Sequence, residues 1–187
     1  LKISIVASKY DDKFKKSIGS HPRLVFPYYD SGGSIICYSC RSFGKEQPKY
    51  IKLAVDNTKE KLYGLWRIDK SKPIYVVEGQ IDSLFIDNCI AVGSANYSSE
   101  FIIKNKDNVI VVPDSDYKRN PQVCQSIEKI INLGYKIALF PDSIQWKDIN
   151  DMVVKGGMSK DEIKSLIDSN IMCGMQAKLE LSFRKKF

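Results

Sequence analysis

Acidic side chains stand at the ends of three short apolar runs in this sequence. The acids are Glu78 after residues 74–77, Asp114 and Asp116 after residues 109–112, and Asp148 and Asp151, with the amide Asn150 between them, after residues 136–140. Apolar runs of this length are typical of buried strands. Because ligand chemistry in parallel sheets gathers at the carboxyl ends of the strands, the pattern predicts that these side chains converge.

Local spacing supports the same convergence. Asp82 lies four residues after Glu78, which places it in the first turn of a predicted helix near that strand end. Gly79 lets the chain turn tightly out of the strand. Asp114 and Asp116 are two residues apart, so in an extended chain their side chains point to one side.

Clustered carboxylates indicate a cation, because like charges repel strongly unless a positive ion lies between them. Oxygen ligands without histidine or thiolate select a hard ion, Mg²⁺ or Mn²⁺, over zinc or copper. A pair of such ions stabilises both the attacking and the leaving oxygen of an in-line displacement. Taken singly, each motif is typical of a loop or a helix cap. Together, their order after successive strands favours phosphoryl or nucleotidyl transfer.

The segments from residue 74 onward alternate between strand and helix. Expected strands and helices follow one another along the chain: strands at 74–77, 89–92, 109–112 and 136–140, and helices at 80–88, 96–105, 121–133 and 160–169. A capping box, Ser159 with Glu162, opens the last helix. This rhythm predicts an α/β domain with a mostly parallel sheet and helices on both faces.

The first part of the chain has a different pattern. Apolar residues 23–29 end in the turn sequence 30–34, and residues 35–40 resume as a second strand, which predicts a hairpin in a small mixed or antiparallel unit. We therefore expect an N-terminal basic subdomain at 1–72, an α/β catalytic domain at 73–158, and a C-terminal helical segment with a basic tail at 159–187.

Charge is unevenly distributed over these parts. The net charge is +7. Residues 1–61 contain 12 basic and 6 acidic residues, and residues 178–187 contain 4 basic residues and 1 acidic residue. The middle, residues 62–177, contains 13 basic and 15 acidic residues. Basic flanks around a slightly acidic centre favour a polyanion as partner and a cation in the centre, although a lysine-rich surface also simply maintains solubility. The apolar runs are too short to cross a bilayer, so we expect a cytoplasmic protein without a membrane partner.

The five cysteines favour reduced thiols over a disulfide framework, because their number is odd and they lie in apolar segments. Cys37 and Cys40 form a CxxC pair, but there is no second pair, and His21 is no matched partner. Two thiols within a strand are the favoured interpretation, and a zinc site is the disfavoured one.

The acid motifs resemble those of the topoisomerase-primase (Toprim) domain. Its Glu-Gly signature is similar to residues 76–82, Val-Val-Glu-Gly-Gln-Ile-Asp. Its Asp-x-Asp motif is similar to residues 111–116, and the turn between the two motifs is similar to residues 92–95. The likeness covers about residues 74–155. It implies Glu78, Asp114 and Asp116 as catalytic and metal-binding acids, with Asp82 and Asp148 in support.

The first 70 residues are similar to the N-terminal subdomain of bacterial-type DNA primases, in the same order and at similar distances. The resemblance rests on residues 23–33, Arg41, residues 48–50 and residues 61–64. It implies a basic ridge that binds template and nucleotide phosphates, with Tyr50 either stacking on a base or buried. The basic candidates are Arg41 and Lys49, then Arg23, with Lys59 and Lys61 after them.

The primase resemblance also implies the partners: a single-stranded DNA template, nucleoside triphosphates, an RNA–DNA hybrid product and a replicative helicase. Lys52 replaces an expected asparagine, and residues 117–120, Tyr-Lys-Arg-Asn, stand where a small Ala-Gly is expected. This divergence favours a phage or other viral primase, acting in the cytoplasm of a bacterial host. Because the chain opens at Leu1 and shows no zinc-binding domain, we expect a fragment.

Three alternatives remain beside primer synthesis. A Toprim nuclease uses the same metal ions with water as nucleophile. A nucleic-acid-binding module that has lost catalysis has little use for concentrated negative charge near phosphate. A topoisomerase is disfavoured because none of the 10 tyrosines identifies itself as a nucleophile.

Overall fold

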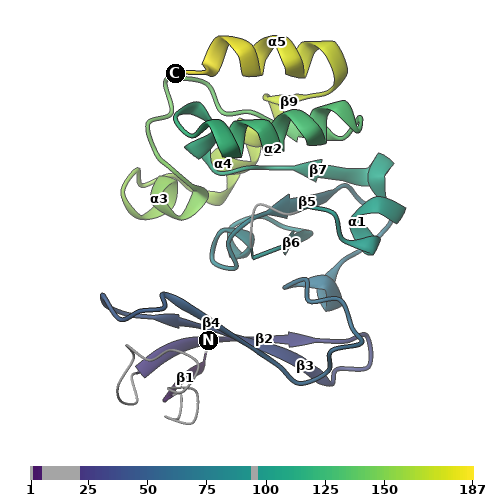
Figure 1. Cartoon of the computed structure of the whole chain (residues 1–187), viewed down its shortest axis with the longest axis vertical. Helices are drawn as coiled ribbons and strands as arrows, with labels where there is room; N and C mark the ends of the chain where they lie inside the picture. Colours follow the sequence, from purple (N-terminus) through teal and green to yellow (C-terminus); the bar gives the residue numbers. More distant parts are fainter. Residues whose placement is uncertain (1, 6–21, 94–96) are drawn as a thin grey trace. The chain divides into compact units, whose positions relative to one another are not determined.

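The computed structural model describes residues 2–5, 22–93 and 97–187 of the chain (Figure 1). His21 and the Ser94-Ala95 part of the predicted turn lie outside these ranges. The chain divides into two compact units, residues 1–66 and 67–187. No helix in the described ranges is both long enough and apolar enough to cross a membrane.

The first unit is built on an antiparallel sheet of four strands in the order β1-β2-β3-β4. Their bounds are β1 Lys2–Ile5, β2 Pro22–Tyr29, β3 Ile35–Ser42 and β4 Tyr50–Ala54. The predicted hairpin is confirmed and consists of β2 and β3. The unit was predicted to be mixed or antiparallel, and the described strands pair antiparallel throughout. The turn is fixed by Asp30, whose Oδ1 accepts hydrogen bonds from the amides of Gly32 and Ser34.

Apolar residues from three strands form the core of this sheet. Val25 pairs with Cys40, and Cys40 pairs with Ile51, and these three side chains form a buried cluster. Cys37 and Cys40 are both buried within β3, and burial raises the pKa of each thiol. This agrees with thiols packed in a strand.

The second unit is built on a five-stranded sheet in the order β6-β5-β7-β8-β9 (Figure 1). Four strands are parallel, as predicted: β5 Ile74–Val77, β6 Cys89–Ala91, β7 Val109–Val111 and β8 Lys136–Ala138. The fifth, β9 Ile171–Met172, is antiparallel to β8 and comes from the C-terminal segment, which therefore contributes a strand to this sheet. Strands β5, β6 and β7 are buried at every position, as expected of a sheet covered on both faces.

Helices connect and cover these strands. Their bounds are α1 Glu100–Lys104, α2 Pro121–Asn132, α3 Ile149–Val154, α4 Lys160–Asp168 and α5 Gly174–Arg184, with 3-10 turns η2 Leu65–Arg67, η3 Asp82–Leu84, η4 Lys106–Asn108 and η5 Ser115–Lys118. The predicted capping box at the start of α4 is confirmed in both directions. The tail forms helix α5, which packs on α2 and buries Ala177 and Leu181.

The helix predicted over residues 80–88 is wrong, because only the single turn η3 forms there. Asn88 takes a positive φ of 51°, and its side chain accepts a hydrogen bond from the Asp69 amide and donates to the carbonyls of Asp69 and Pro73. These bonds fix the end of the link beside the start of β5, where β6 begins as its parallel neighbour. Helix α1 is also shorter than predicted and begins at Glu100, where Ser99 caps it.

Candidate active site

The sheet order places the three acid-bearing strands side by side, because β7 is the parallel neighbour of both β5 and β8. Strands β5 and β7 are parallel neighbours, with Val76 opposite Val111, so their carboxyl ends lie at one edge. Glu78 leaves β5 there, and Asp114 follows β7 as the residue before η5. The amide of Gly93 donates to the Glu78 carbonyl at 2.8 Å, which ties the end of β6 to the same place.

Glu78 is half-buried and is held by a tyrosine that the sequence interpretation missed. The Tyr97 hydroxyl donates to Glu78 Oε1 at 3.4 Å, and Tyr97 is only 6% exposed. Burial, together with the charges of Glu78 and Asp114, raises the pKa of Tyr97 well above its usual range, so the phenol stays neutral and remains a donor. Tyr97 lies two residues after the Toprim-like turn at 92–95, and that position was the available signal.

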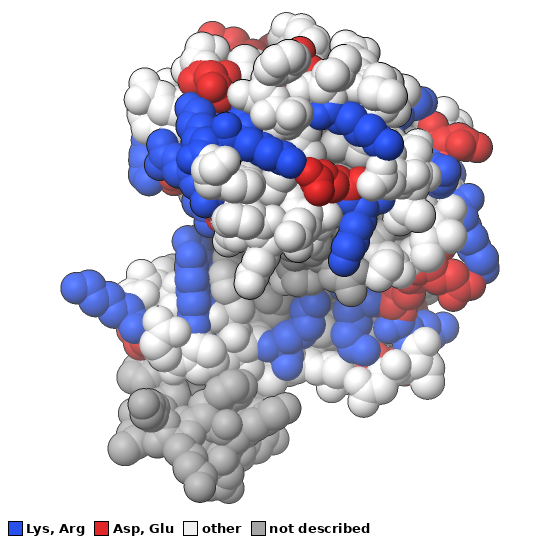
Figure 2. All heavy atoms as spheres, turned by 45° about the horizontal axis from the view of Figure 1, so that its top comes forward, with Lys and Arg blue, Asp and Glu red and all other residues white. Residues whose placement is uncertain are grey.

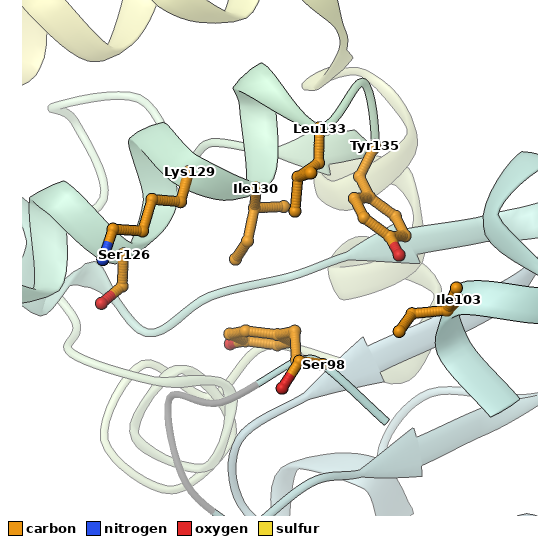
Figure 3. Close-up of a pocket in the computed structure, with 8 residues that line it drawn as sticks. Ser98, Ile103, Ser126, Lys129, Ile130, Leu133 and Tyr135 are labelled. Carbon is orange, nitrogen blue, oxygen red and sulfur yellow. The ribbon is translucent and has the colours of Figure 1, made fainter. Parts of the chain in front are cut away.

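An apolar pocket of about 370 Å³ lies on the other side of Tyr97. Figure 3 shows Ile103 facing Ile130, Leu133 and Tyr135 across this space. The pocket is therefore formed mainly between the segment 97–103 and helix α2, and its lining lacks the carboxylates of the acid set.

Asp114 and Asp116 do not lie on an extended chain, which corrects the sequence prediction. Residues 115–118 form the 3-10 turn η5, so Asp116 lies within this turn and not on an extended strand. The two carboxylates nevertheless approach one group: Lys147 Nζ lies 3.1 Å from Asp116 Oδ2 and 3.9 Å from Asp114 Oδ2. The Ser115 amide also donates to the Lys147 carbonyl at 2.7 Å, which fixes the two loops against each other.

Asp82 is 7% exposed and is turned toward the start of α3. Its Oδ1 accepts a hydrogen bond from the Asn150 amide at 2.8 Å. The chain bends at Glu78, as predicted, but Gly79 does not have a positive φ, so a left-handed conformation is not what requires glycine here. The reason is space, because a Cβ at residue 79 would lie 2.1 Å from Asp82 Oδ2.

Asp148 caps helix α3 and so reaches the same region. Its Oδ1 accepts a hydrogen bond from the Asp151 amide at 2.8 Å. Asp148 therefore has a role in the helix as well as in the acid set, which we define as Glu78, Asp82, Asp114, Asp116 and Asp148.

The pKa values show that the acid set is electrostatically coupled. Burial first, and then the charges of Glu78, Asp82 and Asp148, raise the pKa of Asp114 to about 8, against the lowering effect of Lys147. Burial and the charge of Asp116 also raise the pKa of Glu78. Such coupling requires the carboxylates to lie near one another.

The donor chemistry fits a hard divalent cation. The acid set offers only carboxylate oxygens, and the pKa of Asp114 is raised by burial and by the neighbouring carboxylates despite the charge of Lys147. In the described part of the chain, however, no three His, Cys, Asp or Glu side chains are already grouped tightly enough to hold a metal ion. Lys147, which the sequence interpretation also missed although it directly precedes Asp148, is the cation between the acids.

The basic candidates all lie in the first unit, and the structure separates them by exposure. Lys49 is exposed, and Arg41 is half-buried in β3. Tyr50 is 40% exposed, so the alternative that its ring is buried is wrong. Lys59 is exposed and Lys61 half-buried, both between β4 and η2.

Arg23 is 1% exposed and is directed at the backbone of its neighbours. Its Nη1 donates to the carbonyls of Pro48 at 3.0 Å and Lys49 at 3.5 Å. In this structure Arg23 therefore holds the segment that carries Lys49, whereas the sequence interpretation placed it on a phosphate.

Comparisons with known proteins point to one family. The chain is 36% identical over 172 residues to the DNA primase of Enterobacteria phage T4, an alignment that covers 90% of this chain and 49% of that protein. The chain thus spans about half the length of this curated relative. No protein-family model matches the chain.

Solved structures show the same fold. The Escherichia coli primase catalytic core matches with a TM-score of 0.64 at 18% identity, over 97% of this chain and 70% of that one. A DnaG primase catalytic domain bound to single-stranded DNA matches with a TM-score of 0.63 at 23% identity, over 86% of this chain and 55% of that one. These likenesses confirm the predicted α/β fold with its Toprim domain.

Proposed function

Because this chain is a relative of the bacterial-type DNA primases and has the fold of their catalytic core, we propose that it synthesises short RNA primers on single-stranded DNA. The observation that carries the proposal is the coupling of Glu78, Asp114 and Asp116 at one edge of a parallel sheet. The substrates are nucleoside triphosphates, and the product is an RNA–DNA hybrid. We also infer that a replicative helicase is a partner. The place of action is the cytoplasm, which for a phage-encoded chain is that of the bacterial host.

The reaction joins a 3′-hydroxyl to the α-phosphorus of the incoming nucleotide and releases pyrophosphate. Glu78, Asp114 and Asp116 would hold Mg²⁺ or Mn²⁺, with Asp82 and Asp148 in support for a second ion. When bound, these ions supply positive charge for the attacking and leaving oxygens.

The chain's own residues set up the rest of the site. Glu78, whose pKa is raised, is suited to accept the proton of the attacking hydroxyl. Tyr97 keeps that carboxylate oriented through its hydroxyl. Lys147 adds a positive charge beside Asp116, where phosphate oxygens would approach.

We infer that the basic residues of the first unit bind the template and nucleotide phosphates. Lys49 and Arg41 are the principal candidates, with Lys59 and Lys61 in support and Tyr50 available to stack on a base. Arg23 supports Lys49 from within the unit. By the proposed division, residues 1–72 form the nucleic-acid ridge, residues 73–158 the catalytic domain, and residues 159–187 the C-terminal segment.

Primer synthesis on single-stranded DNA tests this proposal directly. Glu78→Gln and Asp116→Asn should each abolish incorporation of ribonucleotides in Mg²⁺ or Mn²⁺ while the thermal unfolding midpoint stays close to that of the wild type. Asp87→Asn, which neutralises an exposed acid of the same unit, is the control and should retain activity. Normal synthesis by either site variant would remove those roles. Cleavage of labelled DNA without nucleotides would identify the nuclease alternative.

A further inference from the structure

A polar cavity adjoins the acid set on the side of Asp116. Its volume is about 170 Å³, and Asp116 and Lys147 belong to its lining. The other charged or aromatic residues that line it are Lys118, Arg119, Asp142, Trp146 and Lys186. All residues that line the cavity belong to the second unit, whereas the basic candidates belong to the first.

Three segments distant in sequence build this cavity, and backbone contacts hold them together. The Lys186 amide donates to the Lys118 carbonyl at 2.9 Å, which fixes the C-terminal tail against η5. Lys118 Nζ in turn donates to the Pro141 carbonyl at 3.0 Å and lies 3.2 Å from Asp142 Oδ1. The cavity is therefore preformed, and its lining does not have to assemble around a ligand.

Positive charge exceeds negative charge in this lining. Four cationic residues face two carboxylates, because Lys118 and Lys186 share Asp142 while Lys147 pairs with Asp116. Arg119 is exposed, and no ion pair within the described ranges includes it. In Figure 2, Lys and Arg side chains gather on the second unit toward the side where Figure 1 marks the C-terminus. An anion is the ligand that this balance favours.

The size of the cavity and its aromatic wall narrow the ligand further. A volume of about 170 Å³ is sufficient for one small group such as a phosphodiester. Trp146 lines the cavity and is half-buried, so it is an aromatic side chain available to a base next to a bound phosphate. Cations that follow a backbone, combined with an aromatic surface for a base, are typical of single-strand binding.

We propose that this cavity binds a phosphodiester group of the nucleic-acid strand at the active site, with a neighbouring base stacked on Trp146. The inference rests on the proposed function, because it assigns the strand to the same acid set. It also gives a role to Lys118 and Arg119, which belong to the segment 117–120 that replaces the small Ala-Gly expected after Asp116.

Tryptophan fluorescence tests this proposal, because the chain contains only two tryptophans, Trp66 and Trp146. In a Trp66→Phe background, Trp146 is the single reporter. Titration with oligothymidylate of about 10 nucleotides, within the range of known single-strand sites, should quench its emission in Mg²⁺ without nucleotides. The double variant Arg119→Gln/Lys186→Gln should weaken binding severalfold and flatten the slope of log affinity against log salt by roughly 1.4, about 0.7 for each lost phosphate contact.

The matched control is Lys72→Gln/Lys104→Gln in the same background. It removes two exposed lysines from the same unit, which pair with Asp69 and Glu100 and do not line the cavity. The control should leave quenching and salt slope unchanged. An equal change in both double variants, an unchanged slope in the cavity variant, or no quenching by the oligonucleotide would overturn the proposal. Quenching by a nucleoside triphosphate alone, without a response to oligothymidylate, would also overturn the assignment to a strand.

The primer assay separates this proposal from the proposed function. If the wild type makes primers but the cavity variant binds oligothymidylate normally, the cavity proposal fails alone. If Trp146 and the cavity variant respond as expected while the wild type makes no primers, the proposed function fails alone.

Discussion

At the scale of single residues, Asp114 has a strongly raised pKa. Its folded pKa of about 8 lies above the ordinary value of 3.8, mainly because of burial. The folded state therefore keeps a proton that the unfolded chain releases. The resulting stabilisation is complete below about pH 4 and is lost as the pH rises through 8, so the metal-free protein should become less stable across this window.

Asp114→Asn should remove this pH dependence, because the amide has the shape of the protonated acid and no charge. Relative to the wild type, its free energy of unfolding in metal-free buffer should increase between pH 5 and pH 9 by at least about 1.4 kcal/mol, the equivalent of one pKa unit. Urea unfolding at several pH values measures it. Added Mg²⁺ should stabilise the wild type at pH 9 and have little effect on the variant. A constant difference over this range would contradict the prediction.

Lys147 is the second residue whose position has a direct consequence. Burial lowers its pKa, but the hydrogen bond to Asp116 and the charges of Asp116, Asp114 and Asp148 outweigh that effect and raise it. The ammonium therefore stays charged between acids that are proposed to bind a divalent ion. Such an ion and Lys147 compete for the same carboxylates.

Lys147→Gln should tighten Mn²⁺ binding, because the ion no longer displaces a positive charge. Half of the Lys147 side chain is exposed, so the expected gain is modest, about 1 kcal/mol or roughly fivefold in affinity. Titration calorimetry in the absence of nucleotides measures it, with Lys104→Gln as control because its partner, Glu100, lies outside the acid set. Unchanged or weaker Mn²⁺ binding would show that Lys147 does not compete with the ion.

At the scale of elements, the strands were predictable and the links between them were not. Short apolar runs identify β5 to β8, because a strand buried on both faces needs apolar residues at every position. The acids at their ends follow from this pattern. Residues 80–88 also have helical spacing, but the long-range hydrogen bonds of Asn88 decide their structure. Strand β9 has two residues and offers no periodicity to detect.

The same limit applies within the acid set. The glycine after Glu78 signals a special position, and the reason for the glycine is the nearby Asp82 carboxylate. That carboxylate is held in place by the hydrogen bond that the Asn150 amide donates to it. A partner 68 residues away cannot be read from local spacing. For Lys147, too, the sequence shows the residue and not its place between two carboxylates.

Gly79→Ala tests the element-scale explanation. The new Cβ would force the Asp82 carboxylate away from the Asn150 amide, which should lower the free energy of unfolding by roughly 1–3 kcal/mol. In an Asp82→Ala background the same substitution should cost little, because the clashing group is absent and φ is not positive. Denaturant unfolding of the four proteins gives the coupling energy. Equal costs in both backgrounds would refute the contact as the reason for glycine.

At the scale of the whole molecule, charge is divided between the two units. Residues 1–66 carry 12 basic and 6 acidic residues, whereas residues 67–187 carry 17 and 16. The first unit thus has a net charge of +6 and the second of +1, although the second holds the entire acid set. Most of the net positive charge therefore lies in the unit without the acid set, so phosphate attraction by the first unit and metal binding by the second should respond to different substitutions.

Lys49→Gln is the sharpest test of this separation, because Lys49 is exposed and its carbonyl is fixed by both the Ser42 amide and Arg23. Loss of one phosphate contact should flatten the salt dependence of single-stranded DNA affinity by roughly 0.7 and leave Mn²⁺ affinity unchanged. Lys45→Gln, an exposed neighbour outside the candidate set, is the matched control and should alter neither property. Asp116→Asn should show the reverse pattern, with weaker Mn²⁺ binding and a normal salt slope. If Lys49→Gln weakened Mn²⁺ binding as much as Asp116→Asn does, the two properties would not be divided between the units.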